Sequence, residues 1–449
     1  MPDAFDDFLR EHPLTESVDA FLPDLAGVLR GKRLSPPELR RALEGEAFFT
    51  TTVYAIDTPG ANVAESGLVW EEGDADRPLR LDPGTLRVVP WRPGGAQILG
   101  GMTEADGSGF FADMRQLVAR LADRFSSLGL KPVAALEFEF YLVDVASDEG
   151  GAPLVPRSER LDRRPSETEV FAPERMEDQE PFFELVDRYC EAQELPVKGS
   201  LSEFAPGQFE INLDHIDNVL LAADHGVMLK RCIRAAARST GQRATFMAKP
   251  FAEQSGSGLH VHLSLLDRKG RNLFGETPDG ERHLGYAVRG LQDLMAESML
   301  VFAPNANSYR RLRPLTYAPT AATWGWNNRT VALRIPPGGP RARRIEHRLA
   351  GSDANPYLAV AAVLAGVLEG LEKRRDPGPP TTGNAYAQSP PTLPLTWEAA
   401  LAAFRDAERL PHWFGPQLCR LFHAVRQGER NRFHARITPT EYEWYLTTV

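Results

Sequence analysis

The chain has 449 residues, of which 25% are charged and 42% hydrophobic, values that are ordinary for a folded globular protein. Its 61 acidic and 51 basic residues give a net charge of −10, which argues against a general affinity for nucleic acid or for an anionic membrane. The three cysteines are far apart and include no C-x-x-C pair, so neither a disulfide framework nor a thiolate zinc site is expected.

Two features of the sequence bear on where in the cell the protein is found. The first residues are acidic and lack a basic start followed by an apolar stretch, as an export signal would have. The longest apolar stretch, residues 357–368, is too short to span a membrane and instead predicts a buried helix that begins at Asn355-Pro356. We therefore expect a cytoplasmic protein.

In chain order, residues 1–112 come first, and their pattern of predicted elements differs from that of the rest of the chain. Helical patterns at residues 5–10 and 18–29 precede strand-like pieces at 49–56 and 87–91, which are separated by Pro-Gly and Asp-Pro-Gly turns. This segment predicts a small α+β domain.

Residues 113–449 predict a larger domain. Helical spacing predicts a helix over 113–128 that ends at Gly129, and a strand over 133–143 follows. Strands and helices alternate up to about residue 370, a Pro- and Gly-rich surface loop covers 374–396, and a helix over 397–410 begins after Thr396. The sequence has neither a Walker G-x-x-x-x-G-K-[ST] pattern nor a G-x-G-x-x-G after a strand, so a nucleotide would be held by another device.

Two predicted strands each carry a pair of side chains of a kind that can bind metal ions. Glu137 and Glu139 share one face of their strand, where they are either solvated acids or hard oxygen ligands for Mg²⁺ or Mn²⁺. His260 and His262 alternate in the same way after a glycine loop at Gly256, and two imidazoles at this spacing favour a site over structural histidines.

Two further clusters carry acids and arginines. Glu203 and Glu210 flank an Ala-Pro-Gly-Gln turn, which either brings both acids to one point or forms a polar hairpin. Arg344, Glu346 and Arg348 alternate on another strand, with further arginines at 311, 329 and 334. Clustered arginines are costly unless an anion lies between them, and guanidinium groups suit phosphate and carboxylate. Acids and histidine for divalent metals, arginines for phosphate and no P-loop together predict metal-assisted phosphoryl transfer.

In their order along the chain, these motifs resemble those of the glutamine synthetase superfamily. The segments at 63–70, which includes E-S-G-L-V-W, and at 324–329, W-G-W-N-N-R, resemble the branch of that superfamily that ligates organic amines to glutamate. The segments that match the superfamily are L-E-F-E-F-Y at 136–141, E-F-A-P-G-Q-F-E at 203–210, G-S-G-L-H-V-H-L-S-L at 256–265, N-S-Y-R-R-L at 307–312, N-R-T at 328–330, R-I-E-H-R at 344–348 and D-A-N-P-Y-L at 353–358. The resemblance covers nearly the whole chain and is weakest in residues 1–110. It implies an α+β fold, with a small N-terminal β-grasp-like domain (1–112) followed by a large glutamine-synthetase-type α/β catalytic domain (113–449). It also implies a ring-based homo-oligomer such as a dodecamer, with active sites between subunits.

The resemblance also implies a role for each motif residue. Two or three Mg²⁺ or Mn²⁺ ions would be held by Glu139, Glu203 and Glu210 on one side and by Glu137, His260 and Glu346 on the other. L-Glutamate would be bound by Arg311, Arg348 and Gly256, and ATP by Arg334, Arg344, His262 and Ser264. The implied catalytic residues are Arg329, Glu65 and Asp76.

Two departures from the family pattern concern the ammonium site. The family's Y-E-A-P flap reads T-Y-A-P here, so Tyr317 stands in place of an acid, and the D-G-S-S loop is replaced by A-E-S-G at 64–67. A small cation needs close anionic partners, whereas an aromatic wall suits an alkyl or aryl amine.

We therefore expect a γ-glutamyl–amine ligase (an acid–amine ligase). ATP would phosphorylate the γ-carboxylate of L-glutamate, and an amine would attack the γ-glutamyl phosphate to give an amide, ADP and phosphate. The acceptor could be a polyamine, ethanolamine, an alkylamine or an aryl amine. An ordinary glutamine synthetase that uses ammonia and a catalytically silent homologue are the alternatives.

Overall fold

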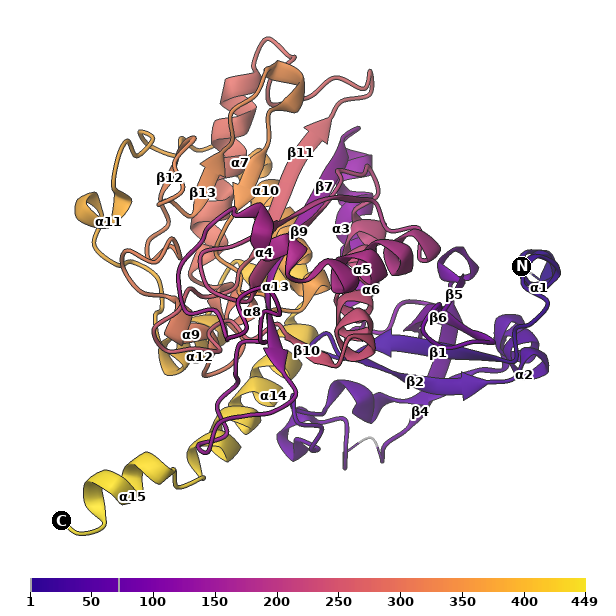
Figure 1. Ribbon diagram of the computed structural model, residues 1–449. Helices are drawn as coiled ribbons and strands as arrows, with labels where there is room; N and C mark the ends of the chain where they lie inside the picture. The colour runs from indigo at the N-terminus through magenta and orange to yellow at the C-terminus, as the bar shows by residue number, and fades with distance from the viewer. Residues whose placement is uncertain (1, 72) are drawn as a thin grey trace.

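A computed structural model of the chain describes residues 2–71 and 73–449, in which two β-sheets are covered and joined by helices (Figure 1). The helices are α1 Pro2–Glu11, α2 Pro36–Arg41, α3 Met114–Ser127, α4 Pro173–Glu177, α5 Glu180–Ala192, α6 Val219–Ser239, α7 Gly280–Met295, α8 Met299–Phe302, α9 Ser308–Arg311, α10 Pro356–Lys373, α11 Ala385–Gln388, α12 Trp397–Arg405, α13 Leu410–Phe414, α14 Pro416–His434 and α15 Pro439–Tyr445. Within the described residues, none of these helices combines the length and the hydropathy of a membrane-spanning segment.

The first sheet is built from residues 17–102. Its strands run in the order β2-β1-β6-β4-β3 with β5 beside β6, and β1 and β6 are parallel. The strands are β1 Ser17–Pro23, β2 Leu29–Leu34, β3 Phe48–Thr50, β4 Asp76–Leu81, β5 Arg87–Val88 and β6 Gly95–Met102. A separate N-terminal sheet agrees with the predicted fold class.

Two predictions within this region were wrong. Residues 18–29 form β1 and a turn rather than a helix: Val18, Ala20 and Leu22 are buried in β1, and the chain reverses at Gly27, which has φ +75°. The same apolar residues satisfy a period of two as well as a helical spacing, and pairing with β6 selects the strand. The strand predicted over 49–56 ends at Thr50, and a 3₁₀ turn follows over Thr51–Tyr54.

The second sheet positions the chemistry. Its strands run in the order β12-β13-β14-β11-β7-β9-β8, with β10 beside β7. They are β7 Lys131–Asp144, β8 Val197–Ser202, β9 Gln208–Leu213, β10 Gln242–Thr245, β11 Leu259–Leu266, β12 Trp324–Trp326, β13 Leu333–Ile335 and β14 Ile345–His347. The predicted strand at 133–143 is thus confirmed as β7, and the predicted helix before it as α3.

One face of this sheet is apolar and covered by helices. Phe138 and Phe140 of β7 are fully buried, and α3 and α6 pack on β7 while α10 packs on β11. A Cβ at Gly226 of α6 would lie 2.6 Å from Leu136 Cδ1, so glycine lets the helix approach the sheet closely. The opposite face carries Glu137 and Glu139 and is free for polar chemistry.

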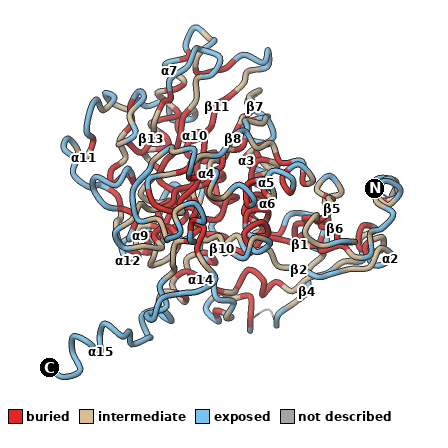
Figure 2. Tube along the Cα trace, viewed as in Figure 1, coloured by how far each residue is buried: buried red, intermediate tan, exposed pale blue. Residues whose placement is uncertain are grey.

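The central helix α10 confirms the predicted buried helix. The Asn355 side chain accepts from Tyr357 N at 2.9 Å, and Pro356 takes the first helical position. A Cβ at Gly370 would lie 1.9 Å from the carbonyl oxygen of Tyr286 in α7, so the two helix backbones touch where glycine replaces a side chain. Figure 2 shows the buried residues concentrated around these elements, whereas α15 projects as an exposed arm.

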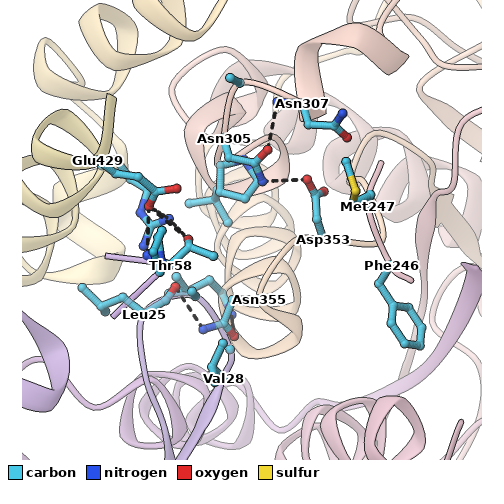
Figure 3. Close-up of a pocket in the computed structure, with 18 of the residues that line it drawn as sticks. Leu25, Val28, Thr58, Phe246, Met247, Asn305, Asn307, Asp353, Asn355 and Glu429 are labelled. Carbon is cyan, nitrogen blue, oxygen red and sulfur yellow. Dashed lines mark hydrogen bonds and ion pairs between the residues drawn. The ribbon is translucent and has the colours of Figure 1, made fainter. Parts of the chain in front are cut away.

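Asp113 connects the first sheet to α3, the helix that packs on β7 of the second sheet. It lies next to the predicted division between residues 112 and 113, which stays a prediction. Asp113 caps α3 by accepting from Gln116 N, and its other oxygen accepts from Tyr54 OH at 3.0 Å and Met102 N at 2.6 Å. A cavity of about 430 Å³ lies at the junction between this N-terminal region, α10 and α14 (Figure 3). Asn355 there donates to Leu25 O, and Glu429 accepts from Thr58.

Candidate active site

Sheet register alone brings the predicted acids and histidines together. The strands β14, β11, β7 and β9 are neighbours and antiparallel. Glu139 lies opposite Glu210, Glu137 opposite His260, and His262 opposite Glu346. Residues opposite each other in a sheet share one face, so segments that are more than 200 residues apart in sequence converge on one surface.

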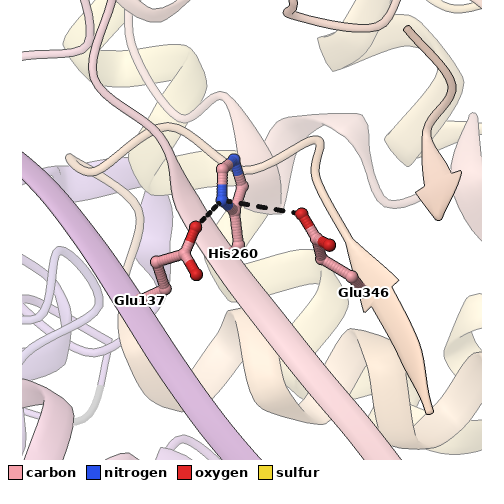
Figure 4. Close-up of side chains that lie close together, drawn as sticks. All are labelled: Glu137, His260 and Glu346. Carbon is pink, nitrogen blue, oxygen red and sulfur yellow. Dashed lines mark hydrogen bonds and ion pairs between the residues drawn. The ribbon is translucent and has the colours of Figure 1, made fainter. Parts of the chain in front are cut away.

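Glu137, His260 and Glu346 form the tightest of these groups (Figure 4). His260 Nδ1 lies 2.5 Å from Glu137 Oε1 and 4.0 Å from Glu346 Oε1. Burial opposes ionisation of Glu137, but His260 and His262 outweigh it and hold the pKa of Glu137 well below its usual range. The three residues expected to hold one divalent ion are therefore placed side by side.

The second group differs in one member from the expected set. Ligand atoms of Glu139 and Glu210 cluster with His260, whereas Glu203 lies outside this group although it lines the same cavity. Burial first, and then neighbouring carboxylates, raise the pKa of Glu203 to about 8 and that of Glu210 to about 10. Carboxylates this crowded repel one another unless a cation lies among them, and oxygen and imidazole donors suit Mg²⁺ or Mn²⁺. The donor set fits the implied ions.

Arginines line the same cavity as Glu137, Glu139, Glu203, Glu210 and Glu346, which are together called its carboxylate floor. Arg334 Nη1 donates to Glu346 Oε2 at 2.7 Å, and Arg348 donates to the other oxygen of Glu346. Burial opposes ionisation of Glu346, but Arg348 and then His262 lower its pKa to about 2. The Nε atoms of Arg334 and Arg348 are buried without a hydrogen-bond partner among the described residues, and Arg329 is exposed at the cavity wall. These guanidinium groups keep capacity for an anion.

The glycine loop is shaped around Arg311. The buried guanidinium of Arg311 donates to the carbonyl oxygens of Leu349 at 2.9 Å and Arg348 at 3.3 Å. A Cβ at Gly256 would lie 2.7 Å from Arg311 Cγ. Gln208, whose role the sequence did not suggest, fixes this loop by donating to Gly256 O at 3.0 Å.

The expected nucleotide residues lie beside the metal cluster. Arg344 Nε lies 3.3 Å from His262 Nδ1, and His262 Nε2 lies 3.3 Å from Glu137 Oε2. Arg344 lines the cavity that contains the carboxylates and arginines described above, which is called the main cavity. It also lines two adjoining cavities of about 320 and 490 Å³, and Ser264 lines the second of these. The sequence did not single out the other polar residues of these adjoining cavities. They are Lys198, Asn212, Asn272, Glu276 and Arg341, and His215 also lines both cavities.

One of these residues, Asn212, could have been identified from its spacing in the sequence. Asn212 follows Glu210 by two positions in β9 and therefore shares its face, and its side chain donates to Glu210 at 2.9 Å. The others come from loops or from strand positions whose partners only the sheet register defines.

The main cavity has a volume of about 340 Å³, and its mouth is aromatic. Tyr317 lines it beside Phe204, with ring centroids 5.9 Å apart. Glu65 and Asp76 lie in the N-terminal region, are exposed, and do not line this cavity. The expected catalytic set is therefore divided: Arg329 is at the cavity, and the two N-terminal acids are elsewhere on the chain.

Comparison with known proteins gives consistent matches over almost the full chain. Residues 111–445 match the family model described as glutamine synthetase, catalytic domain. The chain is 39% identical to the γ-glutamylputrescine synthetase PuuA of Escherichia coli K12, over 98% of this chain and 93% of that protein. It is 32% identical to a glutamate–isopropylamine ligase of a Pseudomonas species, over 99% of this chain and 97% of that protein. A solved GmaS/ADP complex superposes with a TM-score of 0.84 at 27% identity, covering 99% of this chain and all of that one.

Proposed function

The chain belongs to the glutamine synthetase family, and we propose that it joins an organic amine to the γ-carboxylate of L-glutamate while ATP is cleaved to ADP and phosphate. One observation carries this proposal: a single cavity combines the carboxylate and imidazole cluster, the arginines and an uncharged aromatic mouth. The first two features are what phosphoryl transfer to a carboxylate requires, and the third distinguishes the acceptor.

Within this proposal, the chain's own residues bind and orient the substrates. Arg311 and Arg348, with the loop at Gly256, would bind the carboxylates of glutamate, because their guanidinium groups are rigidly held and face the cavity. The side chains that would bind and neutralise the ATP phosphates and the moving phosphoryl group are Arg329, Arg334 and Arg344. His262 and Ser264 would lie on the nucleotide side.

The metal ligands would be Glu137, His260 and Glu346 for one ion and Glu139, Glu203 and Glu210 for another, with two or three ions of Mg²⁺ or Mn²⁺ per site. When bound, these ions would act as Lewis acids that stabilise the negative charge developing during phosphoryl transfer. Glu203 would have to move toward Glu139 and Glu210 to share an ion with them, because its carboxylate lies outside the group that these two form with His260.

The amine is favoured over ammonia by the cavity mouth. Tyr317 supplies a ring where an ammonium site needs a carboxylate, so deprotonation of a small cation has less support there. Glu65 and Asp76 could serve catalysis only from a second copy of the chain, since neither reaches its own cavity. We therefore infer a ring-based homo-oligomer such as a dodecamer, in which an N-terminal domain over residues 1–112 adjoins the catalytic domain (113–449) of its neighbour.

The test is phosphate release by the purified protein with Mg-ATP and L-glutamate. Ammonia is assayed beside diamines, ethanolamine, alkylamines and anilines, and products are identified by mass. Release that depends on both glutamate and an organic amine, with the γ-glutamyl amide as product, is expected. Glutamine as the main product would favour an ordinary glutamine synthetase, and ATP and glutamate binding without any turnover would favour a silent homologue.

A further inference from the structure

Three exposed aromatic side chains gather at the mouth of the main cavity. Phe171, Phe204 and Tyr317 come from separate segments, line the same cavity as Glu203, and are 60%, 38% and 49% exposed. The Phe204 and Tyr317 rings lie 5.9 Å apart at 35°. Large apolar side chains that are clustered and left in water at a pocket mark a binding surface rather than part of the core.

The backbone holds these rings in place. Tyr317 has φ +58° and Leu315 has φ +63°, a left-handed conformation that is unfavourable for residues with a side chain. The loop is fixed by Thr316 Oγ1, which donates to Arg313 O at 2.7 Å, and by Tyr386 OH, which donates to Ala318 O at 2.9 Å.

The partner ring is fixed by the hairpin between β8 and β9. Phe204 directly follows Glu203, whose backbone N–H donates to Gln208 O at 2.9 Å. Phe171 is tied to the same hairpin, because its N–H donates to Ser202 O at 3.1 Å. The aromatic surface therefore begins one residue from the carboxylate floor and extends outward.

Glu203 is the carboxylate next to these rings, and the two acids that precede Phe171 are ion-paired. Glu167 and Glu169, which precede Phe171, are ion-paired with Arg163 at 2.7 Å and Arg175 at 2.6 Å. A second ammonium group would find these carboxylates already neutralised, whereas a hydrocarbon chain would cover apolar surface. The rings are too close for a further ring to enter between them, so a flexible chain fits across their faces better than a flat one.

We propose that Phe204 and Tyr317 form a subsite for the hydrocarbon chain of a primary aliphatic amine, with Phe171 at its outer end. This inference rests on the proposed function and names the acceptor class. The amine nitrogen faces the carboxylate floor, and successive methylene groups pack outward over the two rings.

The experiment measures kcat/KM for methylamine, ethylamine, propylamine and butylamine at saturating Mg-ATP and L-glutamate. Burial of each methylene group predicts a rise of about three- to fourfold, so butylamine should exceed methylamine by about 30- to 60-fold. Phe204→Ala should reduce that ratio to less than about fivefold, because the chain then meets open space rather than a ring. Phe204→Leu should restore most of the ratio, since it keeps apolar surface.

A matched control is Phe433→Ala on α14, which removes an aromatic ring of similar exposure (50%) away from the cavity. It should leave the butylamine-to-methylamine ratio unchanged. Tyr317→Ala, which should also lower the ratio, replaces Phe204→Ala if that variant does not fold.

Three results would overturn the subsite. The first is a wild-type kcat/KM that does not rise with chain length although amines are turned over. The second is a ratio that stays the same in folded Phe204→Ala. The third is a variant whose assembly state changes on size-exclusion chromatography while the ratio does not, since the rings would then contact another subunit. Absence of turnover with every amine would instead contradict the proposed function, and the subsite with it.

Discussion

Gly256→Ala tests whether the glycine loop holds Arg311 in position for glutamate. A Cβ there would lie 2.7 Å from Arg311 Cγ and 2.8 Å from the carbonyl oxygen of Ala248. That oxygen cannot rotate away, because it is part of the backbone and accepts from Ser257 N at 2.9 Å. Either the loop or Arg311 must therefore shift.

The expected change in the KM for glutamate follows from the hydrogen bond to the substrate carboxylate that a displaced Arg311 would lose. Overpacking a tight site costs about 1–3 kcal/mol of folding free energy. A charge-assisted hydrogen bond to a substrate carboxylate contributes about 1.5–3 kcal/mol, so misplacing the guanidinium should raise the KM for glutamate by about 10- to 150-fold. The KM for ATP should change far less, since Arg334 and Arg344 do not contact this loop.

The assay is steady-state phosphate release with glutamate and ATP varied in turn, with circular dichroism to confirm folding. Gly199→Ala is the control, because a Cβ at Gly199 meets no atom within 4 Å. Equal glutamate KM values for the two folded variants, or equal losses for glutamate and ATP in Gly256→Ala, would refute the reasoning.

Three further predictions concern the mouth, the metal cluster and a buried lysine. Tyr317→Glu should increase turnover with ammonia relative to organic amines, because it restores a carboxylate at the mouth; unchanged selectivity would show that Tyr317 does not face the acceptor. Mn²⁺ at 100 times its Kd should stabilise the protein by about 2.7 kcal/mol in urea unfolding, and Glu210→Gln should weaken that gain, whereas an equal gain would place the ion elsewhere. Burial first, and then Arg234, lower the pKa of Lys230 from 10.5 to about 7. Between these pH values the unfolded chain binds the extra proton, so the wild type should gain up to about 1.4 kcal/mol per pH unit over Lys230→Met as pH rises from 7 to 9, and a constant difference in urea unfolding would contradict this.

The features most predictable from sequence were those with local signals. The alternation of Glu137 with Phe138 in β7 indicated both the strand and its polar face, and Asn355-Pro356 indicated the start of α10. Residues 18–29 misled because short apolar runs fit two periods, and only the parallel partner β6 decides between them.

The sequence predicted which residues belong to the site better than it predicted how those residues are arranged. The motifs identified Glu137, His260 and Glu346, but their convergence depends on the pairing of β7, β11 and β14, which is set by long-range register. The hydrogen bond from Gln208 to Gly256 and the ring contact of Phe204 with Tyr317 join segments 48 and 113 residues apart, and no local pattern encodes either.

The central claim is that this site transfers the γ-glutamyl group to an organic amine in preference to ammonia. A competition assay tests it most directly: ammonia and an aliphatic amine at equal concentrations in one reaction with Mg-ATP and L-glutamate, with both products quantified by mass. The account predicts that the γ-glutamyl amide is the main product for at least one amine of the panel. Glutamine as the main product against every amine would contradict it.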